Sequence, residues 1–277
     1  MIINNDNFRL VGIIGNPLAQ SMSPMLHNYW LNKYKINSSY VPFSLKNLDD
    51  IKPSIKAMNL VGLNITIPYK KEIIYHLDSV DRKAKELKAV NTVLNKKGKL
   101  IGFNTDIDGF GRGLEKKTNW IKTNPVYIFG AGGAAEAIIS FIYSAGSKDI
   151  TIINRTIDNA KNIARRYKGV KFTDKVKKEE IAKAGLLVNT TSLGMIGYPD
   201  LNIDLEGINK KAIIYDIVYN PIETTLIKKA KKQGLKYITG IDMFIEQARR
   251  SFEIWFNISP ELDKKLLISL KKKINKK

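Results

Sequence analysis

The sequence contains no cysteine and only two histidines, His27 and His76. The lack of cysteine excludes disulfides, thiolate metal ligands and a cysteine nucleophile, and it is consistent with a reducing compartment. A zinc site built from histidine and cysteine is therefore not expected, and we predict no metal site. No G-x-S-x-G segment is present to indicate a Ser-His-Asp hydrolase. We expect His27 to have a structural role rather than to act as a base.

Long hydrophobic runs are also missing. Met1–Arg9 is polar and lacks the apolar core of a signal peptide. The most apolar stretch, Val126–Gly146, is interrupted by four glycines and by Glu136, which disfavours a membrane span. We therefore predict a cytoplasmic protein without a membrane partner.

Acidic residues are outnumbered by basic ones, with 26 Asp and Glu against 46 Lys and Arg and a net charge of +20. Such a charge raises the hypothesis of nucleic-acid binding. The lysines are scattered, however, as in Lys96–Lys99 and Lys228–Lys232, and no zinc finger, RNP motif or basic-aromatic alternation accompanies them. We expect no nucleic-acid partner, and a positive field that attracts anionic small molecules such as a carboxylate or a phosphorylated cofactor.

The 277 residues are enough for two domains, and strand and helix patterns alternate along them. This alternation predicts an α/β fold with mostly parallel sheets. Strands are expected at 9–14, 39–43, 61–67, 89–94, 99–103, 126–129, 150–153, 186–189 and 213–217. Helices are expected at 24–34, 48–58, from about 68, and at 134–144, 157–167, 244–256 and 261–273.

A dinucleotide fingerprint is present only in the second part of the chain. We therefore place the domain boundary between Asp106 and Asn124. The first domain is predicted to span residues 1–107 and to be completed by C-terminal helices within 240–277. The second domain is predicted to span residues 108–239.

The apolar strand Val126–Phe129 leads directly into Gly130, Ala131, Gly132, Gly133, Ala134 and Ala135. The match to G-x-G-x-x-G/A places Gly130 in the tight turn, Gly132 where a pyrophosphate approaches the backbone, and Ala135 where helix and strand pack closely. The pyrophosphate then lies at a helix N-terminus, where free N–H groups favour anions. This context predicts a dinucleotide cofactor.

The next strand ends in Asn154, Arg155 and Thr156. An NAD site usually has an acidic residue here for the ribose 2′-hydroxyl. Arg155 suits a 2′-phosphate instead, so NADP is the predicted cofactor. Asp158 lies close to Arg155 in the sequence, and an acidic residue there would suit the ribose 2′-hydroxyl of NAD, so NAD remains an alternative cofactor.

Three polar clusters in the first part of the chain indicate a substrate site. Ser21 and Ser23 stand before Pro24 at an expected helix N-terminus, with Ser23 as its N-cap, where two hydroxyls can hold a carboxylate. Thr66 lies on the expected strand 61–67 and shares one of its faces with Asn64. Lys70 is placed in the first turn of the next expected helix, where a lysine can serve as general acid or base.

The third cluster consists of two polar residues at the ends of neighbouring expected strands. Asn91 lies in Ala89–Thr92 and Asp106 follows Gly102–Thr105. Each residue taken alone is also a common turn former.

Together these segments resemble the shikimate dehydrogenase family over nearly the whole chain. The matching segments, in order, are Ser21–Pro24, Asn64–Lys70, Ala89–Thr92, Asn104–Asp106, Gly130–Ala135, Asn154–Thr156, Asn189–Ser192 and Gly240–Gln247. The resemblance implies an N-terminal α/β substrate domain, a Rossmann-type doubly wound NADP-binding domain and a cleft between them. It also implies reversible, NADPH-dependent reduction of 3-dehydroshikimate to shikimate in aromatic amino-acid biosynthesis.

By that resemblance, Lys70 and Asp106 form the catalytic pair. Lys70 protonates the carbonyl oxygen as hydride arrives from the nicotinamide, and Asp106 orients Lys70 or shares the proton relay. Substrate contacts are implied for Ser21, Ser23, Thr66, Asn91, Tyr219 and Gln247. Cofactor contacts are implied for Gly130 through Ala135, Asn154, Arg155, Thr156, Ile217 and Gly240.

Some residues depart from the family pattern. Lys88 stands where glycine is common, and Asn159 replaces a second basic residue that often supports Arg155, which bears on the preference for NADP. An NAD-dependent quinate/shikimate dehydrogenase is the nearest alternative, although Ser23 is not the threonine that quinate enzymes tend to have. A non-catalytic NADP-binding regulator is a second alternative, which the Lys70 and Asp106 pair disfavours. The sequence leaves monomer and homodimer open.

Overall fold

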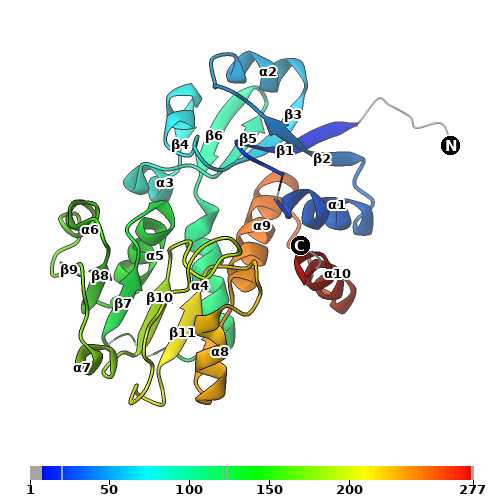
Figure 1. Ribbon diagram of the computed structural model, residues 1–277. Helices are drawn as coiled ribbons and strands as arrows, with labels where there is room; N and C mark the ends of the chain where they lie inside the picture. Colours follow the sequence, from blue (N-terminus) through cyan, green and yellow to red (C-terminus); the bar gives the residue numbers. More distant parts are fainter. Residues whose placement is uncertain (1–7, 20, 121, 123, 276–277) are drawn as a thin grey trace. The chain divides into compact units, whose positions relative to one another are not determined.

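The computed structural model describes residues 8–19, 21–120, 122 and 124–275, so most of the polar N-terminal segment Met1–Arg9 lies outside it. The chain divides into two compact units (Figure 1). The first falls within Met1–Thr105 and Ala248–Leu270, and the second within Asp106–Gln247 and Lys271–Lys277. No helix in the described residues is both long enough and apolar enough to cross a membrane.

The first unit is built on a six-stranded mixed sheet with the order β2-β1-β3-β5-β6-β4. β1 is parallel to β2 and β3, whereas β5 is antiparallel to β3 and β6. The strands are β1 (Arg9–Gly15), β2 (Ser38–Ser44), β3 (Leu60–Ile65), β4 (Ser79–Val80), β5 (Thr92–Lys96) and β6 (Lys99–Phe103). The helices are α1 (Ser23–Lys33), α2 (Ile51–Ala57), the 3-10 helix η2 (Glu72–His76) and α3 (Arg82–Leu87).

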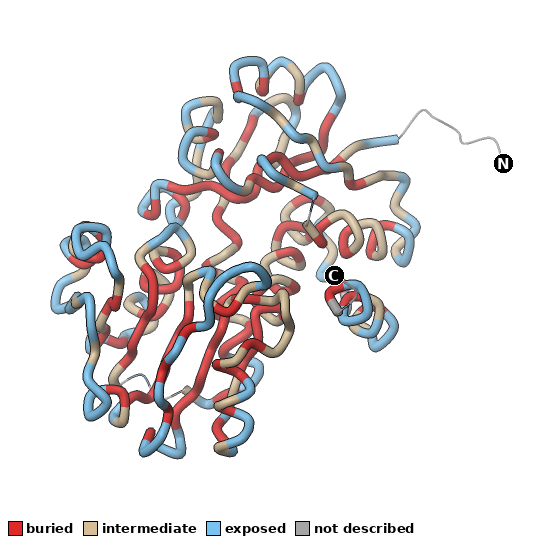
Figure 2. The backbone as a smooth tube through the Cα atoms, viewed as in Figure 1, coloured by how far each residue is buried: buried red, intermediate tan, exposed pale blue. Residues whose placement is uncertain are grey.

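Alternate residues of the central strands form the core of this unit. β3 is buried along its whole length, as the red tube in Figure 2 shows, which is why it lacks polar alternation. Ile14, Leu63, Ile65 and Leu100 join the side chains of α2 in one apolar cluster. The polar residues beyond the strand ends therefore follow strands that are buried in this core.

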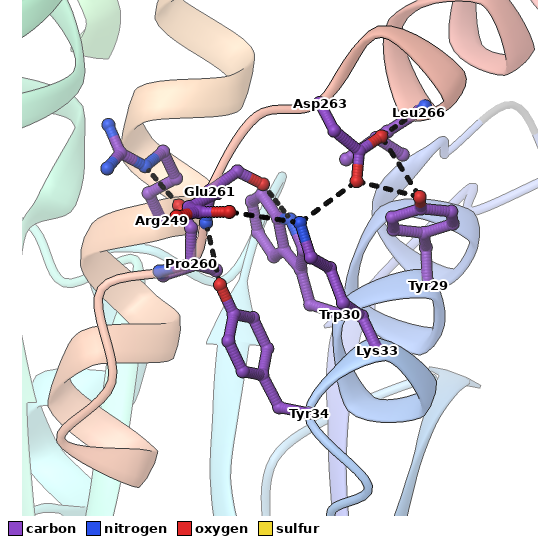
Figure 3. Close-up of polar contacts among 9 residues, drawn as sticks. All are labelled: Tyr29, Trp30, Lys33, Tyr34, Arg249, Pro260, Glu261, Asp263 and Leu266. Carbon is purple, nitrogen blue, oxygen red and sulfur yellow. Dashed lines mark hydrogen bonds and ion pairs between the residues drawn. The ribbon is translucent and has the colours of Figure 1, made fainter.

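The segment that precedes α10 (Lys264–Asn275) is attached to α1 by a group of polar contacts (Figure 3). Lys33 forms ion pairs with Glu261 at 3.3 Å and Asp263 at 3.0 Å, and the Tyr29 hydroxyl donates to Asp263. The buried Trp30 indole donates to the Glu261 carbonyl. Exposed ion pairs contribute little by themselves, so buried apolar side chains such as Trp30 and Leu266 supply most of the stabilisation.

The second unit contains a six-stranded sheet in which every pair is parallel, with the order β12-β11-β10-β7-β8-β9. Counted from β7, this is the 3-2-1-4-5-6 order of doubly wound dinucleotide-binding sheets. The strands are β7 (Val126–Phe129), β8 (Ile150–Ile153), β9 (Lys171–Thr173), β10 (Leu186–Asn189), β11 (Ile213–Asp216) and β12 (Lys236–Ile238). The helices are α4 (Thr105–Lys117), α5 (Gly133–Ser144), α6 (Ile157–Ala164), α7 (Lys178–Ile181) and α8 (Thr225–Lys232). The helix α9 (Gly240–Phe256) begins in this unit, and its residues from Ala248 onward belong to the first unit.

Both faces of this sheet are covered. Val126 and Ile128 point into one apolar cluster, and Tyr127 and Phe129 point into another. A strand buried on both faces appears in sequence as a continuous apolar run. The predicted α/β class with a doubly wound second sheet is confirmed.

The prediction of a helix starting near Pro68 is wrong. Residues 67–71 form a turn, and the short 3-10 helix η2 follows. The Ile67 carbonyl accepts from the Asn16 N–H at 2.9 Å, and the Lys70 carbonyl accepts from the Val90 N–H at 2.8 Å. Because these tertiary partners occupy carbonyls that a helix would use internally, the segment satisfies its backbone without an α-helix.

The helix α4 is not predicted from the sequence, because it contains three glycines that are poor helix formers. Its packing explains them. A Cβ at Gly109 would lie 2.7 Å from the Gln247 Cβ on α9, and one at Gly113 would lie 2.5 Å from the Tyr215 hydroxyl. Tertiary contact therefore overrides helix propensity here.

Candidate active site

In the first unit, Thr66 lies just beyond the carboxyl end of β3. Its N–H donates to the Ile14 carbonyl at 2.9 Å, which joins it to the end of the neighbouring strand β1. A Cβ at Gly15 would collide with the Thr66 methyl group. Glycine at position 15 therefore lets the Thr66 side chain lie over the end of β1, where the residue is half-buried.

Lys70 lies in the turn after β3 and is also half-buried. Its carbonyl accepts from the Val90 N–H at 2.8 Å, so its backbone lies beside the segment that leads to Asn91. The neighbouring Lys71 is exposed. Lys70 is therefore positioned by tertiary contacts rather than by a helix N-terminus.

Asn91 fixes the beginning of α4. Its Oδ1 accepts from the Thr105 N–H at 2.7 Å and from the Thr105 and Thr92 hydroxyls at 3.1 Å each. Because these donors use Oδ1, the Asn91 group that can bind a ligand is its Nδ2 amide, a donor. Asp106 follows Thr105 directly in the first turn of α4, where the helix dipole favours a carboxylate.

Two sets of hydrogen bonds involve the serines and Asn91. The Ser21 hydroxyl accepts from the Ser23 N–H at 3.3 Å. The buried Tyr40 hydroxyl donates to Asn64 at 2.8 Å, and Asn64 donates to the Asn91 carbonyl at 3.2 Å. Burial raises the pKa of Tyr40, and a hydrogen bond with Ser23 partly opposes that shift.

The prediction that Ser23 is the N-cap of α1 is wrong, because Ser23 is the first residue of the helix. The cap is Met22 in a helical conformation, without a side-chain hydrogen bond, and Pro24 follows within the first turn. The Ser23 N–H donates to the Ser21 hydroxyl at the start of this first turn. His27 is completely buried one turn later, stacked on Tyr40 at 4.4 Å.

In the second unit, the glycine loop between β7 and α5 contains two kinds of glycine. Gly130 has φ +109°, and a Cβ there would lie 2.5 Å from the Thr190 hydroxyl, so the fold itself requires glycine. Gly132 and Gly133 are exposed, and a Cβ on either would meet nothing within 4 Å. The space beside them is open to a ligand.

This open space lies at the N-terminus of α5. Gly132 is the N-cap and offers no side-chain hydrogen bond, and the first helical bond runs from the Glu136 N–H to the Gly132 carbonyl. The N–H groups of residues 133–135 therefore have no intrahelical acceptor and suit an anion. Ala135 is completely buried against Val126 and Ile128, so the helix lies close to β7.

The loop after β8 lies beside the glycine loop, because the Gly130 N–H donates to the Ile153 carbonyl at 2.8 Å. Asn154 donates through Nδ2 to the Thr156 carbonyl at 2.7 Å and thereby shapes the loop. Arg155 and Thr156 are exposed. A ligand that lies along the glycine loop can therefore reach both side chains.

The remaining predicted residues lie near the end of β11 and on α9. Tyr219 stacks on Phe244 at 5.2 Å, and burial raises the pKa of Tyr219. Gln247 donates to the Phe244 carbonyl at 3.0 Å. A Cβ at Gly240 would collide with the Ile217 carbonyl, so glycine there allows α9 to begin against the backbone of Ile217.

One polar group in this region is not predicted from the sequence. Asp216 is completely buried at the end of β11, and it accepts from Asn189 at 2.9 Å, from the Val218 N–H at 3.0 Å and from the Thr224 hydroxyl at 2.6 Å. Burial raises the pKa of Asp216 to about 6, and the hydrogen bonds oppose that shift. A carboxylate that ends an apolar strand, as in Ile213–Asp216, is the signal that could have identified it.

The structure thus assembles two groups of residues, one in each unit. Hydrogen bonds link Tyr40 through Asn64 to Asn91, and Thr66 and Lys70 lie in the segment that follows β3. The second group comprises the glycine loop, the Asn154–Thr156 loop and the ends of β10 and β11. The first group offers hydroxyls, an amide and an ammonium, and the second offers an anion site.

Family models match three parts of the chain. A shikimate dehydrogenase substrate binding domain matches residues 13–93, a shikimate/quinate 5-dehydrogenase model matches residues 113–194, and a shikimate 5′-dehydrogenase C-terminal domain matches residues 240–264. The NADP(+)-dependent shikimate dehydrogenase of Methanococcus maripaludis strain S2 is 39% identical over 272 residues, which cover 93% of this chain and 95% of that protein. The chain belongs to the shikimate dehydrogenase family.

Solved structures agree with this membership. The shikimate 5-dehydrogenase of Thermus thermophilus, in complex with NADP(H) and shikimate, is 30% identical with a TM-score of 0.83, covering 96% of this chain and 100% of that one. The quinate dehydrogenase of Corynebacterium glutamicum, in complex with NAD, is 29% identical with a TM-score of 0.87, covering 97% and 98%. The resemblance inferred from the sequence motifs is confirmed.

Proposed function

We propose that this member of the shikimate dehydrogenase family catalyses the reversible reduction of 3-dehydroshikimate to shikimate with NADPH. The observation that carries the proposal is the open anion site at the N-terminus of α5 in a chain whose named relatives are NADP(+)-dependent shikimate dehydrogenases. In this proposal the first unit binds the substrate and the second unit binds the cofactor. The reaction serves aromatic amino-acid biosynthesis.

The second unit fits NADP in two respects. The N–H groups of residues 133–135 would hold the pyrophosphate, because the Cβ positions of Gly132 and Gly133 are open. Arg155 is an exposed cation on the loop that adjoins this site, and it would hold the 2′-phosphate. When bound, the nicotinamide supplies the hydride for the carbonyl carbon.

The chain's own residues supply the proton. Lys70 Nζ donates a proton to the carbonyl oxygen of 3-dehydroshikimate, which becomes the new hydroxyl of shikimate. In the oxidative direction Lys70 accepts that proton from the hydroxyl. Asp106 orients the ammonium and stabilises its charge. The donors of Ser21, Ser23, Thr66 and Asn91 bind the carboxylate and ring hydroxyls, together with Tyr219 and Gln247.

The direct test follows the absorbance of the reduced cofactor when the protein is mixed with shikimate and either NADP or NAD. We expect rapid reduction of NADP and slower reduction of NAD. The absence of turnover with either cofactor would overturn the proposed activity.

Substitution of Gly132 separates cofactor binding from folding. Gly132→Val is expected to leave the melting temperature nearly unchanged, because its Cβ meets no protein atom within 4 Å and its φ is −92°. The dissociation constant for NADP should rise about tenfold or more, since the side chain enters the space assigned to the pyrophosphate. Titration of NADP by protein fluorescence measures the change.

Gly130→Ala is the contrasting variant. It should lower the melting temperature, because Gly130 has φ +109° and its Cβ would meet Thr190.

Normal NADP affinity in Gly132→Val would refute the placement of the pyrophosphate.

Arg155 is predicted to determine the preference for NADP. Arg155→Ala should raise the KM for NADP about tenfold or more through loss of a charge-assisted hydrogen bond, and should leave the KM for NAD unchanged. Arg165→Ala is the matched control, because Arg165 is another exposed arginine at the opposite end of α6. Equal increases in both KM values would show that Arg155 does not contact the 2′-phosphate.

Oxidation of quinate with NAD is the second candidate function. The likeness to the quinate dehydrogenase of Corynebacterium glutamicum, with a TM-score of 0.87, favours it. Asp158 and Asn159 follow the loop of Arg155, and neither supplies a second cation for a 2′-phosphate. A higher kcat/KM for quinate with NAD than for shikimate with NADP would favour this candidate.

A further inference from the structure

The carboxylate of Asp216 joins two loops of the second unit. It accepts hydrogen bonds at both ends of the segment that follows β11, from the Val218 N–H at 3.0 Å and from the Thr224 hydroxyl at 2.6 Å. This one side chain therefore closes the loop of residues 217–224. Thr224 also begins α8, because its Oγ1 accepts from the Ile227 N–H.

The same carboxylate reaches the loop that follows β10 through Asn189. Asn189 donates to Asp216 Oδ1 at 2.9 Å and to the Leu193 carbonyl at 3.0 Å. The Asn189 Oδ1 accepts from both the N–H and the hydroxyl of Thr191. Further along, the Ile196 N–H donates to the Asn220 carbonyl at 3.1 Å, so the two loops are joined at a second point.

These loops hold residues that the proposed function uses. Ile217 and Tyr219 lie on the loop that Asp216 closes, and Thr190 lies against Gly130 of the cofactor loop. We propose that Asp216 is a positioning residue whose carboxylate holds the 190–196 loop and the 217–224 loop in a single arrangement, so that the binding of cofactor and substrate depends on it. This inference rests on the proposed function for the identity of both ligands.

The chemistry of the three donors favours the ionised form of Asp216. Two N–H groups point at Oδ1 and one hydroxyl points at Oδ2, and hydrogen bonds to a carboxylate are stronger than those to a neutral acceptor. Among the described residues, the groups that influence its carboxylate are Thr224, Val218 and Asn189, and none of them is charged. Burial raises the pKa of Asp216 to about 6, so the arrangement should weaken as the pH falls below that value.

The experiment compares the wild type with Asp216→Asn and Thr224→Val. Asparagine keeps the size of the side chain and can still accept at one oxygen, but its amide must donate to Thr224 instead of accepting from it. Asp149→Asn is the control, because Asp149 precedes β8 and its carboxylate forms an exposed ion pair with Lys171. Three quantities are measured from pH 5 to 8: amide hydrogen exchange without ligands, the dissociation constant for NADP, and the KM for shikimate.

We expect Asp216→Asn to speed exchange at Val218 and Ile227 and to raise the NADP dissociation constant and the KM for shikimate about tenfold. Thr224→Val should cause a smaller change in the same direction. As the pH falls below about 6, the NADP affinity of the wild type should decrease, because Asp216 becomes protonated. The NADP affinity of Asp216→Asn should not show this additional decrease, because asparagine does not titrate. The cofactor phosphate also titrates near this pH, but it does so equally with both proteins.

A lower melting temperature with unchanged NADP affinity, unchanged KM and parallel pH profiles would show that Asp216 only stabilises the fold, and would overturn the proposal. Hydrogen exchange and NADP titration require no turnover. If the wild type fails to oxidise shikimate, the proposed activity falls, while these two measurements still decide the role of Asp216.

Discussion

Lys70→Met is expected to lower kcat for shikimate oxidation by about 10²–10⁴-fold, the usual contribution of a general acid or base. Methionine keeps the length and much of the volume of the side chain in its half-buried turn. The Lys70 backbone bond to Val90 does not depend on the side chain, so the turn should persist. The dissociation constant for NADP should be unchanged, because Lys70 lies in the unit assigned to the substrate. Steady-state kinetics and NADP titration measure the two effects.

Lys71→Met is the matched control, because Lys71 is the next residue and is exposed. It should retain nearly full activity, and equal losses in both variants would remove Lys70 from the mechanism. Lys70→Arg separates proton transfer from electrostatic binding, since arginine keeps the charge but does not release its proton. Recovery of most activity in Lys70→Arg would assign Lys70 an electrostatic role.

His27→Phe is expected to make the protein less sensitive to acid. His27 is completely buried among aromatic rings, with Tyr40 at 4.4 Å, Trp255 at 5.3 Å and Trp30 at 5.6 Å. Neither ring nitrogen has a hydrogen-bond partner in the described part of the chain. Burial lowers the pKa of His27 from 6.5 to about 3.

The sign of the effect follows from the two protonation states. The unfolded chain binds a proton at His27 below pH 6.5, whereas the folded protein binds it only near pH 3. The free energy of unfolding therefore falls as the pH drops through this window, by about 1.4 kcal/mol per pH unit and about 5 kcal/mol in all. Phenylalanine fits the aromatic surroundings and removes this dependence.

Urea unfolding at pH 7 and pH 5 measures the difference. Between these values the wild type should lose about 2 kcal/mol more than His27→Phe. His76→Gln is the control, because His76 is the other histidine and is only half-buried, at the end of η2. Parallel losses in the wild type and His27→Phe would show that His27 is already protonated or solvated in the folded protein.

Short-range patterns in the sequence were enough to identify the cofactor part of the fold. Val126–Phe129 is an apolar strand followed at once by the glycine loop and α5, and all of these features lie within about twenty residues. The apolar strands β7, β8, β10 and β11 were predicted for the same reason. Burial on both faces imposes a continuous apolar run that is visible without any knowledge of the partners.

Tertiary structure decided the features in which a residue's partner is distant in sequence. The backbone of Lys70 is held by Val90 and the beginning of α4 by Asn91, so the helix predicted near Pro68 does not form and a glycine-rich helix does. Asp216 receives its donors from Asn189, Val218 and Thr224, and only the parallel pairing of β10 with β11 brings Asn189 beside it.

The sequence by itself determined the α/β class and the family, because local periodicity and motif spacing encode them, and it predicted the residue types of both proposed ligand sites. The tertiary structure decided which polar groups are buried, which of them pair, and which backbone groups are free for a ligand. Those properties depend on desolvation and on hydrogen-bond geometry between distant segments. That is why Gly130 and Gly132, which look alike in the sequence, differ in the fold: one is required by the backbone and the other leaves space for a ligand.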